Sequence, residues 1–428
     1  MKKIIKYLRK IIPHNSPLRL WYTRIIQLIA YINKPVDVSN IKLIGVTGTD
    51  GKTTTVEMIA HILRVNGIKY ISSSSLEIKK NGVKLEASKR TTPSLFTLKR
   101  LLKQASLENI DIVIIEVSSH ALAQWRVLGV KFDATILTNL THEHLNFHKT
   151  IERYAAAKKL LFTKHLKKDG VAILNKDDTY GSKWLNELNC TTIPYMQPEA
   201  STSARGVSFV YNNKHYSMPM LGTYNTANAL AAALAVASQV SNIDVKSALS
   251  SMSTFTGISG RMQIIPIPKS TTKPDLIVIV DFALTQKAMA STLSTARELA
   301  GEASKVFVVF GATGGQHDTS VRSGLTEAVS AGADVAIVTD DEPYDSNPAN
   351  IRSKLVKFIE DANKKYNNVT VVHNVADRRV AIQQALSDAE YRDVVVVSGM
   401  GHYTSRTVNG EELPWNDAQV ITEELAKL

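Results

Sequence analysis

Short apolar runs alternate with longer amphipathic stretches along most of this chain, which predicts an α/β fold. The runs are rich in β-branched residues and short enough to be buried strands. Helical patterns lie between many of them, notably at Ser94–Ala105 and Thr150–Leu166. Strands separated by helices are typical of a mainly parallel sheet covered on both faces. The expected strands are Ile41–Val46, Lys69–Ser73, Ile112–Val117, Ala134–Asn139, Val171–Asn175 and Thr191–Pro194.

The same alternation resumes after residue 259, which predicts a second, Rossmann-like α/β domain. A hairpin at 207–217 and an alanine-rich helix at Asn225–Gln239 precede it. Helical patterns such as Gln286–Leu299 and Pro348–Asn363 separate the new strands. We therefore divide the chain into a helical arm (1–40), a central domain (41–258) and a C-terminal domain (259–428). The strands of the last are Leu276–Asp281, Lys305–Phe310, Val335–Thr339, Val369–Val372 and Val394–Ser398.

The pattern of residues 1–40 predicts two short helices with a break around Pro13–Pro17. They hold eight Lys or Arg against Asp37 alone, so they carry +7 of the net charge of +12. A basic amphipathic helix with a Trp is typical of a membrane surface; packing of the apolar face on the protein's own body is the alternative. No nucleic-acid partner is expected, because no recognised binding motif accompanies the charge. The apolar face comprises Leu18, Trp21, Ile25, Leu28, Ile29 and Ile32.

The composition indicates a soluble protein of the cytoplasm. Of 428 residues, 44% are hydrophobic and 21% charged, which is ordinary for globular proteins. Cys190 is the single cysteine, so an internal disulfide framework is excluded. No apolar run is long enough to span a bilayer, and the basic start lacks the apolar core of a signal peptide.

A glycine-rich loop follows the first predicted strand and precedes a helical pattern at Thr54–Val65. Such loops turn backbone N–H groups onto a nucleotide phosphate, while a lysine adds charge and a Thr hydroxyl can reach Mg²⁺. In the usual pattern a Gly is followed by four residues and then by Gly-Lys-Ser/Thr, but Val46 stands at the position of that first Gly. The loop is therefore an unusual subtype. Its candidate nucleotide-binding residues are Gly48, Thr49, Asp50, Gly51, Lys52, Thr53 and Thr54.

Further candidate ligands follow downstream. Glu116 closes an apolar strand, and the carboxyl ends of parallel strands line ligand crevices, so Mg²⁺ is its natural partner. The segment from His142 to His148 holds three histidines and Glu143, which invites a zinc interpretation. Mg²⁺ is favoured, because no cysteine lies nearby and a phosphate loop calls for oxygen ligands. Lys158, on an alanine-rich helix, is unremarkable taken alone.

These and other motifs occur in the same order as in the Mur ligases, so the chain resembles that family. It is most similar to the members that add the third residue of the peptidoglycan stem peptide. The resemblance runs from about residue 41 to the end. The motifs are Thr-Gly-Thr-Asp-Gly-Lys-Thr (47–53), Thr-Thr-Pro (91–93), Glu-Val-Ser-Ser-His-Ala-Leu (116–122), Thr-Asn-Leu…His-Leu (138–145), Tyr-x-x-x-Lys (154–158), Leu-Asn-x-Asp-Asp (174–178), Gly-x-Tyr-Asn-x-x-Asn (222–228), Gly-Arg-Met (260–262), Val-Asp-Phe-Ala (280–283) and Gly-x-Gly-His (399–402).

The resemblance implies an ATP-dependent ligase with an ATP-binding central domain and a C-terminal domain that closes over it and brings the amino acid. ATP would phosphorylate the carboxylate of a UDP-N-acetylmuramoyl-peptide or related acceptor, and a free amino acid would displace phosphate. Lys52 would hold the ATP phosphates, Thr53 and Glu116 one Mg²⁺, and His144 a second. Lys158 would be carbamylated into a further Mg²⁺ ligand. The enzyme is expected to be a monomer.

The remaining expected contacts are also implied by the resemblance. The acceptor would be held by Thr91, Thr92, Ser118, Gln124 and Arg126. Asn225 and Asn228 would lie near adenine, Arg261 near the phosphates and Asp281 near the ribose. The amino-acid pocket would be lined by Asp341, Glu342, Tyr344, Gly399, His402 and Tyr403.

Two departures from the family pattern bear on the substrates. The family carries a further N-terminal domain that grips the uridine nucleotide, and only the basic arm precedes the loop here. Members that use diaminopimelate carry Asp-Asn-Pro-Arg and Gly-Lys-Gly-His-Glu, where this chain has Asp-Glu-Pro-Tyr (341–344) and Gly-Met-Gly-His-Tyr (399–403). A site selects strongly through buried polar contacts, so we expect diaminopimelate not to be preferred. Lysine, ornithine and other amino acids stay open.

Two other functions stay open at this point. One is a related ligase with another acceptor, such as a folate polyglutamate or poly-amino-acid ligase. The other is a non-catalytic ATP-binding partner, which the altered C-terminal motifs favour and the intact Mg²⁺ set opposes.

Overall fold

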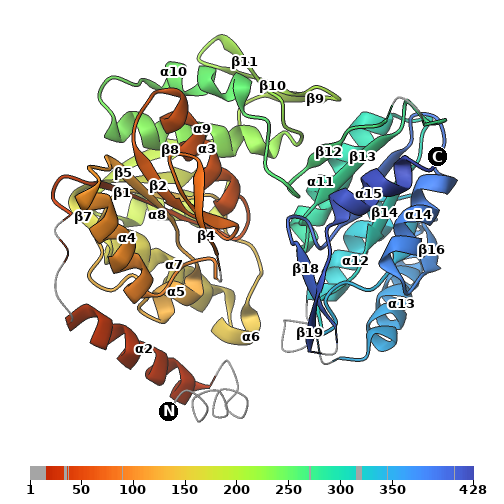
Figure 1. Ribbon diagram of the computed structural model, residues 1–428, viewed down its shortest axis with the longest axis horizontal. Helices are drawn as coiled ribbons and strands as arrows, with labels where there is room; N and C mark the ends of the chain where they lie inside the picture. The colour runs from red at the N-terminus through yellow and green to blue at the C-terminus, as the bar shows by residue number, and fades with distance from the viewer. Residues whose placement is uncertain are drawn as a thin grey trace. The chain divides into compact units, whose positions relative to one another are not determined.

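The computed structural model describes residues 16–32, 36, 38–88, 90–268, 271–314, 321–344, 346–408 and 410–428, in two compact units (Figure 1). The first unit comprises the chain up to Pro198 together with Asn225–Phe255. The second comprises Glu199–Tyr224 and Thr256–Leu428. The segment 199–224, which the sequence grouped with the central domain, is thus grouped with the second unit. The predicted first helix of the arm lies outside the described residues.

The first unit is built on a sheet whose described strands run mostly parallel. From β2 to β8 each strand is parallel to its neighbour, while β3 and β4 extend one edge as an antiparallel hairpin. The central strands are buried on both faces, as parallel sheets require. The order is β4 (Val83–Ala87), β3 (Glu77–Lys80), β2 (Tyr70–Ser73), β5 (Ile112–Glu116), β1 (Lys42–Thr47), β6 (Phe132–Leu137), β7 (Leu166–Asn175) and β8 (Thr191–Tyr195).

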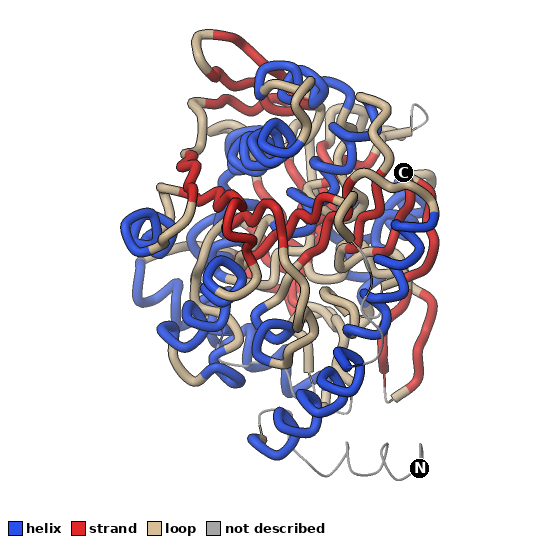
Figure 2. Tube along the Cα trace, turned by 90° about the vertical axis from the view of Figure 1, so that its left-hand side faces the viewer, coloured by secondary structure: helices blue, strands red, loops and turns tan. Residues whose placement is uncertain are grey.

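Helices cover both faces of this sheet, as Figure 2 shows from the side of the first unit. Several begin at polar N-caps: Ser94 caps α4, Thr150 caps α7 and Asp178 caps α8, each accepting a backbone N–H of the first turn. The helices are α2 (Pro17–Ile32), α3 (Lys52–Val65), α4 (Leu95–Leu107), α5 (Ser119–Ala123), α6 (Leu145–His148), α7 (Ile151–Thr163), α8 (Thr179–Glu187), α9 (Tyr224–Gln239) and α10 (Val245–Ser250), followed by a 3₁₀ turn at Ser251–Thr254.

The second unit contains another mainly parallel sheet, with only β12 antiparallel among its described strands. Its order is β12 (Gln263–Ile265), β13 (Ile277–Asp281), β17 (Val394–Ser398), β14 (Val306–Phe310), β15 (Val335–Val338) and β16 (Val371–Asn374). A small antiparallel sheet joins β9 (Ala200–Ser203), β10 (Gly206–Tyr211) and β11 (Lys214–Met218), and β18 (Ser405–Val408) pairs with β19 (Glu411–Pro414). The helices are α11 (Gln286–Ala300), α12 (Val321–Gly332), α13 (Pro348–Tyr366), α14 (Arg378–Asp388) and α15 (Asp417–Leu425).

The predicted α/β class with mainly parallel sheets is therefore confirmed. The expected strands and long helices are present with end shifts of a few residues. In the described parts of the chain, no helix is both long and apolar enough to cross a membrane.

Candidate active site

The glycine-rich loop joins β1 to α3 and is held in shape by the end of β6. Asn139 accepts the Asp50 N–H through Oδ1 at 2.9 Å and the Thr49 N–H through its carbonyl at 2.9 Å. Thr138 donates its hydroxyl to the Asp50 carbonyl at 2.6 Å. A Cβ at Gly48 would lie 1.8 Å from the Thr138 Oγ1, so only glycine fits this approach.

The N-terminus of α3 presents the groups that a phosphate needs. Gly51, at φ +80°, turns the chain into the helix and leaves the first N–H groups without intrahelical partners. The Lys52 ammonium lies in the same loop and donates to the Thr49 carbonyl at 2.6 Å. The helix dipole and Lys52 together favour an anion at this point. Thr54, two residues after Lys52 on α3, is buried.

Glu116 lies at the carboxyl end of β5, level with Val46 on β1. It is 1% exposed, and its carboxylate accepts the Thr53 hydroxyl at 3.0 Å. The Ser75 N–H and hydroxyl also donate to it, at 2.7 Å and 3.0 Å. A buried carboxylate beside the Thr hydroxyl of a phosphate loop is an oxygen donor pair suited to Mg²⁺. Ser75, which the sequence analysis missed, fixes the carboxylate in this position.

Lys158 lies on α7 beneath the loop and is buried. Its amine donates to the Gly48 carbonyl at 2.5 Å and lies 4.5 Å from the Tyr154 ring centroid. Burial lowers the pKa of Lys158 well below its ordinary value, and the charge of Lys52 adds to the effect. The amine is thus shifted toward its neutral, nucleophilic form.

Three histidines lie close together near Lys158 and Tyr154. His144 precedes α6 with φ +56°, and its imidazole is 40% exposed. The His120 ring packs 4.7 Å from that of His144 and 5.6 Å from that of His148, measured between centroids. Burial lowers the pKa of His120 to about 2 and of His148 to about 4, so both are neutral near pH 7. Of the residues that the structure describes, no three His, Cys, Asp or Glu are grouped to hold a metal ion.

Most of the predicted acceptor residues meet next to Glu116. The Thr92 hydroxyl donates to the Glu116 carbonyl at 2.8 Å and accepts the Ser118 N–H at 2.9 Å. Arg126 donates to the Thr92 carbonyl at 3.1 Å and to Gln124 Oε1 at 3.0 Å. Burial lowers the pKa of Arg126 to about 10, which leaves it cationic at neutral pH. Thr91 precedes Thr92 in the same loop.

Asn228, on α9, also reaches the loop, with Asn225 beside it. Asn228 donates to Asn225 Oδ1 at 3.0 Å, and its own Oδ1 lies 3.4 Å from the Thr55 hydroxyl. A Cβ at Gly51 would lie 2.6 Å from that same Oδ1. The pair therefore packs against the start of α3.

The predicted residues of the second unit form clusters of their own. The Arg261 guanidinium lies 4.4 Å over the Phe282 ring, which also packs against His402 and Tyr403 at centroid distances of 5.0 Å and 5.3 Å. Burial lowers the pKa of His402 to about 3. Asp281 accepts the Met262 N–H at 3.0 Å and the Thr292 hydroxyl at 2.5 Å, so both oxygens already have partners within the unit.

The predicted amino-acid residues include two acidic side chains at the end of β15. Asp341 is 3% exposed, its pKa is raised to about 6 by burial, and neither carboxylate oxygen has a hydrogen-bond partner among the described residues. Tyr344 donates its hydroxyl to Glu342 at 3.1 Å. A Cβ at Gly399 would lie 2.8 Å from Asp341 Oδ2, so glycine leaves this carboxylate room.

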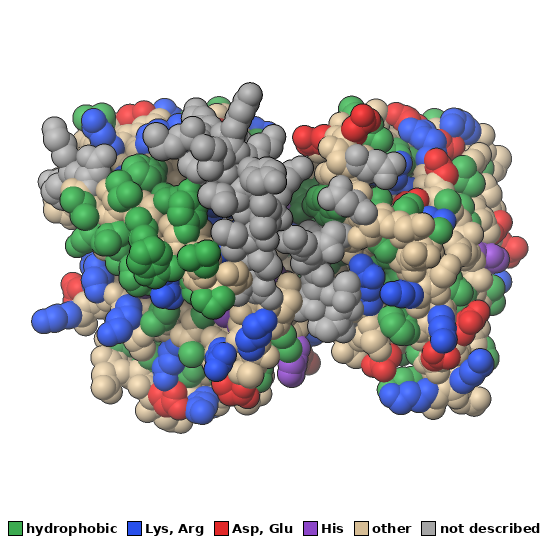
Figure 3. Space-filling model, turned by 90° about the horizontal axis from the view of Figure 1, so that it is seen from below, with side chains coloured by type: hydrophobic (Ala, Val, Ile, Leu, Met, Phe, Trp, Pro, Cys, Tyr) green, Lys and Arg blue, Asp and Glu red, His purple; other side chains and the backbone are tan. Residues whose placement is uncertain are grey.

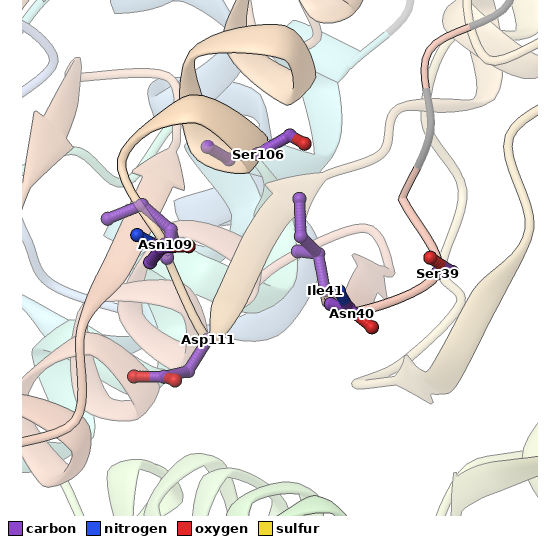
Figure 4. A pocket seen from close by; sticks show the side chains of 8 residues that line it. Ser39, Asn40, Ile41, Ser106, Asn109 and Asp111 are labelled. Carbon is purple, nitrogen blue, oxygen red and sulfur yellow. The ribbon is translucent and has the colours of Figure 1, made fainter.

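A pocket at the other end of the first sheet has no part in this arrangement (Figure 4). It is lined by the residues that precede β1 and β5, including Asn40, Ile41 and Asp111. The phosphate loop and Glu116 follow these same strands, so the strand length separates the two places, roughly 16–20 Å.

Two family models match the chain: the Mur ligase middle domain over residues 46–236 and the Mur ligase glutamate ligase domain over residues 260–401. The chain is 34% identical over 404 residues to the UDP-N-acetylmuramoyl-L-alanyl-D-glutamate–2,6-diaminopimelate ligase of Aquifex aeolicus, covering 92% of this chain and 79% of that protein. This protein belongs to the Mur ligase family. It is therefore an ATP-dependent ligase that forms carbon–nitrogen bonds.

Other relatives agree with this placement. The Bacillus velezensis ligase of the same name is 31% identical over 421 residues, with 93% of this chain and 81% of that protein covered. Solved structures share the fold. One is a UDP-N-acetylmuramoyl-L-alanyl-D-glutamate–2,6-diaminopimelate ligase (TM-score 0.60, 24% identity, 94% and 81% covered). Another is the Mycobacterium tuberculosis folylpolyglutamate synthase (TM-score 0.66, 16% identity, 95% and 94% covered).

Proposed function

We propose that this Mur ligase adds the third residue of the stem peptide to a UDP-N-acetylmuramoyl-dipeptide, through an acyl phosphate. The observation that carries the proposal is the convergence of Lys52, Glu116 and Lys158 on one glycine-rich loop. The relatives named for this reaction support the acceptor class. Phosphoryl transfer needs positioning and charge neutralisation more than covalent help, and this loop offers both.

The candidate residues of the first unit would each have a role in this reaction. Lys52 and the start of α3 would hold the ATP phosphates. The hard oxygen donors of Thr53 and Glu116 fit Mg²⁺, and His144 would hold a second ion. When bound, these ions neutralise charge on the phosphates. Asn225 and Asn228 would contact adenine. Ser75 keeps the Glu116 carboxylate oriented, because it donates two hydrogen bonds to it.

We further propose that Lys158 is carbamylated. A neutral amine attacks the carbon of CO₂, forms a nitrogen–carbon bond and releases a proton, which leaves a carbamate anion. The lowered pKa of the buried amine supports this step. The product would be a carboxylate-like group beside the loop, which would offer oxygen ligands to Mg²⁺.

The other substrates would be held by the residues described above. Thr91, Thr92, Ser118, Gln124 and Arg126 would place the acceptor carboxylate, with Arg126 as its cation. In the C-terminal domain (259–428), the family resemblance implies that Arg261 would contact the ATP phosphates and Asp281 the ribose. The residues around Asp341 and Tyr403 would take the amino acid. We propose that the enzyme acts as a monomer in the cytoplasm, with residues 1–40 in peripheral contact with the inner face of the membrane.

Diaminopimelate is expected to be a poor substrate. Tyr344 and Tyr403 stand where diaminopimelate users carry the arginine and glutamate that grip the distal end, and Tyr344 is directed onto Glu342. A buried site that lacks these polar groups cannot select diaminopimelate strongly over other amino acids. The test is phosphate release from ATP with UDP-N-acetylmuramoyl-L-alanyl-D-glutamate and a panel of single amino acids, with product masses checked.

Lysine, ornithine or another amino acid without a distal carboxylate should give the highest turnover. The double variant Tyr344→Arg/Tyr403→Glu should gain activity with diaminopimelate relative to the preferred substrate. Highest turnover of the unmodified chain with diaminopimelate would refute the specificity proposal alone. Release with a folate acceptor and glutamate, and with no muramoyl acceptor, would refute the proposed acceptor.

A further inference from the structure

The apolar stripe of α2 points away from the body of the first unit. Leu18, Trp21, Ile29 and Ile32 are 60%, 64%, 57% and 73% exposed, and Leu28 is also exposed. Their spacing of three and four residues places them on one side of the helix. Figure 3, which views the molecule from below, shows hydrophobic side chains gathered on the surface of this unit. Large side chains so arranged mark an interaction surface.

The opposite side of α2 attaches the helix to the protein through both polar and apolar groups. Arg24 donates to the Ala123 carbonyl at 2.9 Å and lies 4.9 Å from the Trp125 ring. Gln27, which is 6% exposed, accepts the Leu95 N–H at 2.9 Å. Ala30, on the same side, is fully buried in the apolar core of the unit. The helix is thus held by this side, and its apolar stripe stays exposed.

The positive charge around this exposed face indicates which kind of partner binds there. Residues 1–32 contain seven Lys or Arg and no acidic residue. The neighbouring α4 adds Lys99, Arg100 and Lys103. Basic residues beside exposed Trp, Leu and Ile are typical of helices that lie in the interface of anionic bilayers. A second copy of the chain would bring the same positive charge and be repelled.

We infer that α2 is a membrane-docking surface, which rests on an anionic bilayer with its apolar stripe among the lipid headgroups. Its anchors adjoin residues of the proposed acceptor site: Ala123, the last residue of α5, precedes Gln124, and Leu95, the first residue of α4, follows the Thr91–Pro93 segment. Docking therefore brings the acceptor loops to the membrane surface. The docking narrows the membrane contact proposed above for residues 1–40 to α2 and to anionic lipid, and this last consequence also rests on the proposed acceptor site.

Vesicle cosedimentation of the purified full chain tests the inference. The chain should bind vesicles that contain phosphatidylglycerol, bind phosphatidylcholine vesicles less, and lose affinity as salt is raised. The variant Trp21→Ser/Ile29→Ser/Ile32→Ser should lose at least tenfold in affinity. Val369→Ser, which removes an apolar side chain 91% exposed in the second unit, should bind like the unmodified chain.

Retained ATP binding by the triple variant shows that it is folded, and vesicle binding is read out independently of ligase activity. Absence of binding by the unmodified chain, or equal binding by the triple variant, would overturn the inference. So would a dimer that the triple variant converts to a monomer without any vesicle binding.

Discussion

Replacing Lys158 by alanine is expected to lower the ligation turnover number by about 10²–10³-fold, the loss typical of removing one preorganised electrostatic group from a transition-state site. ATP binding should stay close to normal, because Lys52 and the start of α3 supply the phosphate contacts. The fold should survive, since an unmodified amine at this buried position is costly to keep charged. Phosphate release and nucleotide binding, measured on the same preparation, separate the two effects.

Lys159→Ala is the matched control. Lys159 is the next residue on α7 and pairs at 2.5 Å with Glu187 near the surface, so its loss should change turnover little. Depletion of dissolved CO₂ should lower the activity of the unmodified enzyme, and bicarbonate should restore it. Equal activity of the two alanine variants would refute the role of Lys158.

Glu116→Gln is the second substitution with a large expected effect. The change keeps the shape of a buried side chain but removes its charge, so Mg²⁺ should bind more weakly and turnover should fall by about 10²-fold or more. The measurement is turnover as a function of Mg²⁺ concentration.

Glu57→Gln provides the comparison, because Glu57 is also a buried carboxylate of the first unit but pairs with Lys79 on β3 at 2.9 Å. It should alter stability without moving the Mg²⁺ dependence. An unchanged Mg²⁺ dependence in Glu116→Gln would contradict the assignment of the site.

The sequence predicted the elements whose pattern is strong and local. Buried parallel strands such as Ile112–Glu116 are continuous apolar runs, and long helices such as Pro348–Tyr366 carry a clear apolar stripe. The hairpin of β3 and β4 was missed because its residues are largely polar and partly exposed. Its turn, Asn81-Gly82 with both φ angles positive, is a hairpin signal that could have revealed it.

The same distinction applies to the candidate site: residues within one local motif were predictable, and contacts between distant segments were not. Lys52 and Thr53 are predictable because the loop is one contiguous motif. The contact of Ser75 with Glu116 could not be predicted, since it joins the ends of two strands that are distant in sequence. Lys158 was singled out only through the family resemblance. Its burial and its hydrogen bond to Gly48 depend on how α7 packs beneath the loop, which no local pattern encodes.

Activation of the acceptor carboxylate as an acyl phosphate is the step on which the proposed function rests. The most direct measurement uses UDP-N-acetylmuramoyl-L-alanyl-D-glutamate labelled with ¹⁸O in its carboxylates, together with ATP and the preferred amino acid. One ¹⁸O should pass into the released phosphate for each amide bond formed. Amide formation with unlabelled phosphate would contradict it.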